Sequence, residues 1–95
     1  MDEFIKFLDY FWNKYEATYE DTDGSKFFDF EIVNKEDYEK LEDYCWQYLI
    51  KGQHWNFENK KILKEHGYIC YAGDQDSFGL LVACVEKDNK NFSFG

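Results

Sequence analysis

The stretch GDQDSFG, in the last third of the chain, is the part of the sequence whose residue types most resemble a metal site. An EF-hand loop follows the pattern D-x-[DN]-x-[DN]-G-x5-E, in which oxygen ligands surround calcium. Asp74, Asp76 and Gly79 match this pattern. However, Phe78 stands at the fifth position and Val85 at the twelfth, so two ligands are missing. The flanking patterns are also strand-like, and we predict a hairpin turn whose aspartates bond their own backbone.

Cysteine and histidine form the second set of residues that could do chemistry. Zinc sites use closely spaced pairs such as C-x2-C, and the nearest pair here is His66 with Cys70. All three cysteines fall within apolar patterns, where free cysteine behaves as a small hydrophobe. We therefore predict no metal and no cofactor, with a small metal-binding or Cys/His enzyme as an alternative. The residues of this set are Cys45, Cys70, Cys84, His54 and His66.

Other catalytic signatures are weak. The sequence contains no nucleophile elbow, no glycine-rich phosphate loop and no dinucleotide fingerprint. Asp29 and Glu31 could act as a paired acid and base, but on the exposed face of a strand they are expected to be solvated. The chain is therefore predicted not to be an enzyme.

The carboxylates are concentrated in one part of the chain. The formal net charge is −9, and residues 16–43 carry −8 of it, while residues 1–15 carry −1 and residues 44–95 are neutral. Such a field repels nucleic acid and anionic membranes and attracts cationic partners. We therefore expect a cationic protein partner, with no direct contact to nucleic acid or membrane. The alternative is that these acids only keep an aromatic-rich chain soluble.

Aromatic residues supply the second partner-binding feature. The 10 Phe, 8 Tyr and 3 Trp exceed what so small a core usually takes, and exposed aromatic side chains often anchor partners. Trp46 follows three acids on one predicted helix face, and Tyr10 and Trp12 are further candidates for the centre of an interface. The predicted partner-binding residues are Glu16, Glu20, Asp21, Asp23, Asp29, Glu31, Glu36, Glu39, Asp43 and Trp46.

The acidic segment must be positioned by a helix and a strand. Apolar residues recur at spacings of three and four from Phe4 to Tyr19, which predicts an amphipathic helix over residues 2–20 with an acidic stripe that ends in Glu16 and Glu20. After a loop comes FFDFEIV, which alternates as a half-buried strand. Carboxylates two residues apart on a strand lie about 7 Å apart, a spacing comparable to that of phosphates along a nucleic-acid strand.

The later elements complete an α+β domain. We predict a helix capped by Asn34, a shorter helix that begins after Asn56, and three strands joined by short connections, which favour antiparallel hairpins. The expected order is α-β-α-α-β-β-β in one domain over residues 1–95, with a mostly antiparallel three- to four-stranded sheet and the helices packed on one face. The predicted ranges are helices 35–51 and 56–66 and strands 68–72, 78–87 and 91–95.

These features predict a small acidic protein-binding inhibitor that mimics nucleic-acid phosphates and blocks a basic nuclease or other nucleic-acid-binding protein. In charge and size the chain resembles phage anti-restriction and anti-CRISPR proteins and the immunity proteins of nuclease toxins. The absence of arginine and proline, with frequent Lys, Asn, Ile, Tyr and Phe, suits AT-rich codons, and the odd cysteine count suits a reducing cytosol. We expect a cytoplasmic protein of a bacterium or phage-infected cell. The alternative is an interaction or oligomerisation module without mimicry.

Overall fold

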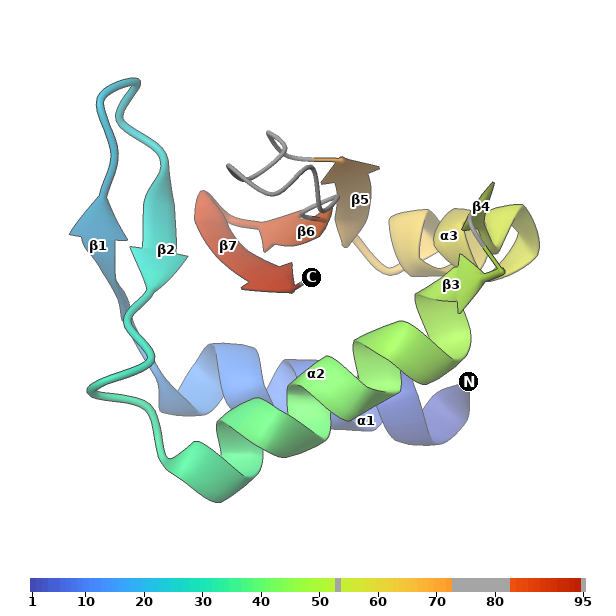
Figure 1. Cartoon of the computed structure of the whole chain (residues 1–95), viewed down its shortest axis with the longest axis horizontal. Coiled ribbons are helices and arrows are strands. Elements are labelled where there is room, and N and C mark those ends of the chain that lie inside the picture. The colour runs from blue at the N-terminus through green and yellow to red at the C-terminus, as the bar shows by residue number, and fades with distance from the viewer. Residues whose placement is uncertain (53, 73–82, 95) are drawn as a thin grey trace.

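The computed structural model of the chain describes residues 1–52, 54–72 and 83–94 (Figure 1). It is an α+β domain, as predicted, and its described part contains three helices and a mixed five-stranded sheet. The predicted turn at residues 73–79 lies outside the described residues. The elements are α1 Asp2–Lys14, β1 Ala17–Glu20, β2 Lys26–Phe28, α2 Lys35–Leu49, β3 Ile50–Lys51, β4 His54–Trp55, α3 Phe57–Glu65, β5 Ile69–Ala72, β6 Ala83–Lys87 and β7 Lys90–Phe94.

The sheet has five strands, where three or four are predicted, and one of its strand pairs is parallel. Its order is β1-β2-β7-β6-β5, in which β2 and β7 run parallel and the other neighbours run antiparallel. Asp88 and Asn89 both have positive φ and form the two-residue turn that joins β6 to β7, in agreement with the expected hairpin. The predicted element order is therefore incomplete, because it omits β1 and the short β3-β4 ladder.

The first helix ends earlier than the spacing of its apolar residues predicts. α1 stops at Lys14, Tyr15 is extended, and residues 17–20 form β1 instead of a last helical turn. The cause is the formation of a hairpin, since β1 gains a hydrogen-bonded partner in β2. Glu16 and Glu20 therefore do not continue an acidic helix stripe, and that prediction is wrong.

The predicted strand FFDFEIV is also shorter than expected. β2 ends at Phe28, and the carbonyl of Asp29 accepts hydrogen bonds from the amides of Ile32 and Val33, which bends the chain toward α2. Alternation is lost at this bend, so Phe30 and Ile32 are exposed rather than buried. Asp29 and Glu31 are consequently not strand neighbours, and the 7 Å phosphate spacing does not apply to them.

The core lies between one face of the sheet and the helices α1 and α2, which cross beneath it in Figure 1. Phe11 of α1 packs edge-on against Phe28 of β2 and Phe92 of β7, with ring centroids 4.9 and 5.6 Å away. The predicted cap of α2 is confirmed, because the Asn34 side chain accepts hydrogen bonds from two backbone amides of the first turn. Asn56 caps α3 in the same way, and α3 packs beside β5.

Candidate partner-binding surface

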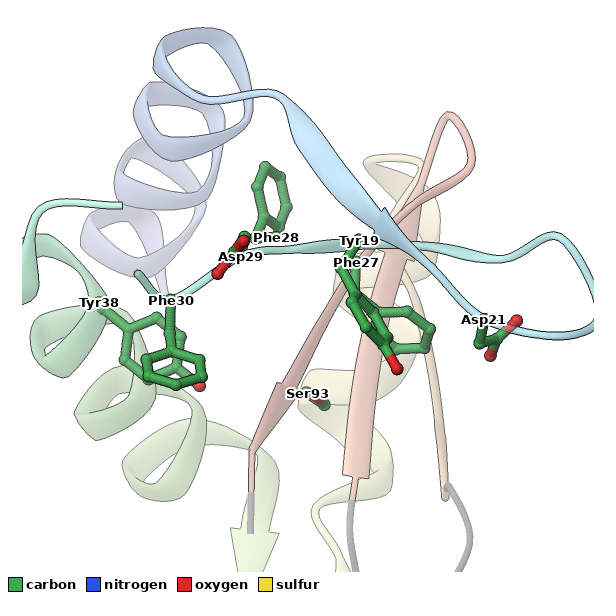
Figure 2. A pocket seen from close by; sticks show the side chains of 8 residues that line it. All are labelled: Tyr19, Asp21, Phe27, Phe28, Asp29, Phe30, Tyr38 and Ser93. Carbon is green, nitrogen blue, oxygen red and sulfur yellow. The ribbon is translucent and has the colours of Figure 1, made fainter. Parts of the chain in front are cut away.

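A groove lies between the β1-β2 hairpin and the N-terminal half of α2 (Figure 2). Its volume is about 380 Å³, and aromatic rings form two of its walls. On one side Phe30 meets Tyr38 at a centroid distance of 6.5 Å, and on the other Tyr19 meets Phe27 at 6.4 Å. Ser93 of β7 lies between the two pairs. Because Phe30 is 68% exposed and Tyr19 is 61% exposed, both walls are open to a partner.

Two of the predicted acidic residues line this groove. Asp29 lies between the aromatic pairs, and its Oδ1 accepts a hydrogen bond from the amide of Glu31 at 2.9 Å, which fixes the direction of the carboxylate. Asp21 lies at the far side of the Tyr19 and Phe27 pair. The pKa of Asp21 is lowered, chiefly by its hydrogen bond with the Asp23 carboxyl. The hydrogen bonds that its carboxylate accepts from two backbone amides lower this pKa further. The groove thus combines aromatic walls with negative charge.

Local backbone bonds build the loop that carries Asp21. Its Oδ1 accepts hydrogen bonds from the amides of Asp23 and Ser25, at 3.1 and 3.2 Å, in the manner of an Asx turn. Gly24 has φ of +85°, a conformation that a residue with a side chain adopts only with strain. The turn therefore holds one groove wall on a tight hairpin.

A buried amide fastens this hairpin to the rest of the sheet. Asn91 of β7 is only 1% exposed, and its Nδ2 donates to the carbonyl of Lys26 on β2 at 2.9 Å. Its Oδ1 accepts the hydroxyl hydrogen of Tyr71, which reaches across from β5. β2 pairs with β7 at only two residue positions. The Asn91 side chain therefore adds substantially to the attachment of the β1-β2 hairpin to β7.

The acids of α2 form a second surface, which we call the α2 acidic face: Glu36, Glu39 and Asp43. All three are exposed. Glu39 lies 3.9 Å from the ammonium group of Lys35, whereas Glu36 and Asp43 have no cation within 4.0 Å among the described residues. Burial of the neighbouring Glu42 carboxyl raises its pKa, and repulsion from Asp43 and Glu39 adds to the shift. Negative charge is therefore crowded on this helix.

The candidate aromatic residues have different environments. Trp46 is 44% exposed, and its ring packs edge-on against the core residue Phe94, with ring centroids 5.8 Å apart. Trp12 is buried and donates its Nε1 hydrogen to the carbonyl of Lys87, which contradicts its proposed place in an interface. The Tyr10 hydroxyl is engaged with the carboxylate of Asp37.

The remaining predicted acids do not join the groove. Glu16 lines a separate depression together with Lys26 and Lys90, and Glu20 is exposed at the end of β1. Asp23 and Glu31 are exposed in the two connections on either side of β2. The ten predicted residues therefore divide between the groove, the α2 acidic face and scattered positions.

Asp37 belongs to the acidic segment but serves the fold. Its Oδ2 accepts hydrogen bonds from the hydroxyls of Tyr10 and Tyr15 and lies 3.1 Å from the ammonium group of Lys14. The hydrogen bond from Tyr15, followed by those from Lys14 and Tyr10, lowers the pKa of Asp37. This carboxylate ties α2 to α1 and is already neutralised by a neighbouring cation.

The cysteines are buried, as predicted. Burial raises the pKa of the Cys70 thiol to about 12 and also raises those of Cys45 and Cys84. A thiol in this state is a poor nucleophile at neutral pH. His54 and His66 are exposed. Within the described residues, no group of three His, Cys, Asp or Glu side chains could hold a metal ion.

Sequence reasoning missed most of the residues that form the groove walls: Tyr19, Phe27, Phe30, Tyr38 and Ser93. The spacing of apolar residues predicts Tyr19 on a helix, and alternation predicts Phe30 in the core. The available signal was the surplus of aromatic residues, since it indicated that some rings must be exposed without showing which.

A comparison with protein-family models finds no match, and comparisons with curated proteins and with solved structures find none either. The geometry of the chain is therefore the basis for any assignment of function. In the part of the chain that the structure describes, no helix has both the length and the apolar character needed to cross a membrane.

Proposed function

We propose that this protein is an acidic inhibitor that binds a basic nuclease or another nucleic-acid-binding protein. It would cover the surface with which that protein binds nucleic-acid phosphates. We place it in the cytosol of a bacterium or a phage-infected cell. The observation that carries the proposal is the position of the groove. Its two exposed aromatic walls lie within the chain segment 16–43, which holds net charge −8.

The charge distribution supports rapid recognition of a cationic surface. Carboxylates that are not neutralised within their own molecule attract a positive partner over roughly 10 Å at 0.1 M salt. On the α2 acidic face, Glu39 lies about one turn and Asp43 about two turns after Glu36, so a carboxylate recurs about every 5 Å along the axis. A single strand of duplex DNA carries one charge per about 3.4 Å of axis. A helix face of this kind can therefore replace part of a phosphate row.

Aromatic side chains support the second part of the proposal, which is stable binding. Charge mainly accelerates association, whereas a desolvated aromatic centre contributes most to slow dissociation. The exposed rings of Phe30 and Tyr19 provide such a centre, and Asp29 and Asp21 line the same groove. An interaction module that does not mimic nucleic acid could have the same acidic and aromatic residues. Competition with nucleic acid is therefore the property that distinguishes the two functions.

The experiment measures inhibition by a triple variant and by a matched control. Glu36, Glu39 and Asp43 are changed to Lys in one protein, and Glu3, Glu58 and Glu65 are changed to Lys in the other. All six are exposed, and both variants have the same net charge. The probes are purified restriction, CRISPR and toxin nucleases, each assayed for DNA cleavage and for binding at low and high salt.

We expect the variant of the α2 acidic face to lose at least about tenfold in affinity relative to the control, because local charge complementarity sets the encounter. Binding to a sensitive nuclease should also weaken as salt rises, and DNA should displace the inhibitor. Equal effects of the two triple variants, or affinity that does not change with salt, would exclude mimicry.

A second candidate, self-association, is favoured by a depression beside α3 and β5. The helix α3 lies across the molecule from the β1-β2 hairpin (Figure 1). There Phe57 and Ile69 are exposed beside three lysines of α3 and border a volume of about 410 Å³. These lysines are complementary to the acidic segment of another copy. Sedimentation velocity over a wide concentration range tests this candidate, and a strict monomer would exclude it.

A further inference from the structure

We infer that the groove between the β1-β2 hairpin and α2 is an arginine pocket, which takes the guanidinium group of a side chain on the partner protein. This inference rests on the proposed function, because it names the group of the cationic partner that would be bound at that same surface. It is argued from the lining of the groove, the fixed carboxylate within it and the chemistry of the possible occupants.

The groove walls are suited to a cation. Ring faces carry negative electrostatic potential, and a cation within about 6 Å of a ring centroid is attracted to it. Phe30 and Tyr19 are each paired edge-on with one other ring, yet more than half of each side chain remains exposed. Each side of the groove therefore offers an exposed ring to a cationic occupant.

The protein already uses such contacts elsewhere. The ammonium group of Lys14 lies 5.2 Å from the Tyr10 ring centroid, and that of Lys40 lies 5.1 Å from the centroid of Phe7. No lysine of the chain is among the residues that line the groove. Within the described residues, the cation–ring contacts are thus satisfied internally at other sites, while the groove walls are available to a cation from outside.

The carboxylate of Asp29 excludes other occupants. Covering it with an apolar side chain would remove its hydration without replacing the lost hydrogen bonds. An anion would be repelled by Asp29 and Asp21. A divalent metal ion would need more oxygen ligands than these two carboxylates offer, and no described cluster supplies a third acid. A cationic side chain satisfies both the carboxylate and the rings.

Arginine fits this lining better than lysine. Its guanidinium group is planar, stacks on aromatic faces and donates two parallel hydrogen bonds to a carboxylate. The lysine ammonium group is compact and strongly hydrated, so its desolvation between the rings costs more. The hydrogen bond from the amide of Glu31 holds one oxygen of Asp29 in place, which leaves the orientation of its second oxygen fixed for an incoming donor.

The test compares octa-arginine with octa-lysine, two peptides of equal charge, by calorimetry at constant salt. Phe30→Ala opens one wall, and its control is Phe57→Ala, which removes an equally exposed ring from α3. Asp29→Asn removes the charge but keeps an acceptor for the Glu31 amide, and its control is Glu31→Gln in the same connection. Because Phe30 is exposed, its replacement should leave the thermal unfolding midpoint nearly unchanged, and circular dichroism checks this.

We expect the unmodified protein to bind octa-arginine about three- to tenfold more tightly than octa-lysine. Phe30→Ala and Asp29→Asn should abolish this preference, while Phe57→Ala and Glu31→Gln should retain it. Equal affinity for the two peptides, or a preference that survives Phe30→Ala, would overturn the arginine pocket.

The two proposals fail in different ways. If both peptides bind equally and nucleases are still inhibited, the arginine pocket is excluded and the inhibitor proposal stands. If the preference for arginine depends on Phe30 but every nuclease remains active, the pocket stands and the inhibitor proposal is excluded. If neither peptide binds the unmodified protein and no nuclease is inhibited, both proposals are excluded.

Discussion

Replacing Asn91 with alanine should detach the β1-β2 hairpin more than it disturbs the rest of the domain. This amide is the buried polar side chain that joins three strands, since it donates to the Lys26 carbonyl on β2 and accepts from the Tyr71 hydroxyl on β5. With alanine at this position, the Lys26 carbonyl and the Tyr71 hydroxyl each lose a hydrogen bond. The hairpin carries one aromatic wall of the groove, so the change also reaches the candidate site.

The expected cost follows from these two hydrogen bonds. A typical hydrogen bond contributes about 1 kcal/mol net, and a buried group left unsatisfied costs about 1–3 kcal/mol. Tyr71 is only partly buried and its hydroxyl can turn to water, whereas the Lys26 carbonyl is directed at the buried side chain of Asn91. We therefore expect Asn91→Ala to lower the free energy of unfolding by about 2–4 kcal/mol. Tyr71→Phe, which removes one bond, should cost about 1 kcal/mol.

Urea denaturation of Asn91→Ala, Tyr71→Phe and the double variant measures these terms. The double variant should be less destabilised than the sum of the single ones, because they share a bond. Native-state hydrogen exchange should show faster opening at residues 26–28 than in β6. Ser93→Ala, on the same face of β7, is the control. A loss below about 0.5 kcal/mol for Asn91→Ala, or unchanged protection of β2, would refute the reasoning.

Two further predictions concern titrating groups. The pKa of Asp37 is lowered in the folded chain, so its contribution to stability is complete above its ordinary value of about 3.9 and is lost as pH falls through the folded pKa. Asp37→Asn should therefore flatten the acid limb of stability measured by thermal unfolding, and an acid limb as steep as that of the unmodified protein would contradict this. The buried thiols should react with iodoacetamide at pH 8 only after guanidinium unfolding, given the raised pKa of Cys70; rapid labelling of the folded chain would contradict their burial.

The elements predicted correctly are those whose local signals agree with their tertiary environment. Asn34 and Asn56 each precede a helix and cap it through their side chains, as short-range hydrogen bonding predicts. The turn at Asp88 and Asn89 likewise depends on local conformational preference. Tyr19 shows why other elements could not be predicted from the sequence. Its spacing from Tyr15 is helical, and only pairing with β2 makes it part of a strand.

The candidate site was predictable in its charge but not in its geometry. The acidic segment is visible in the sequence, and Asp21 and Asp29 were among the predicted residues. Their meeting at one groove depends on the bend after Phe28 and on the parallel pairing of β2 with β7, which joins segments over 60 residues apart. Neither feature has a local sequence signal, so the aromatic walls could not be assigned.

The carboxylates proposed to bind a partner also destabilise the free protein. Burial is the main cause of the raised pKa of Glu42, and repulsion from Asp43 and Glu39 adds to it, as expected for like charges that lie close together on α2. Salt screens this repulsion and so favours the folded chain, but it equally screens attraction to a cationic partner. A bound partner would relieve the same repulsion and stabilise the fold by mass action. Opposite effects of salt on stability and on affinity are therefore a direct consequence of concentrating this charge on one surface.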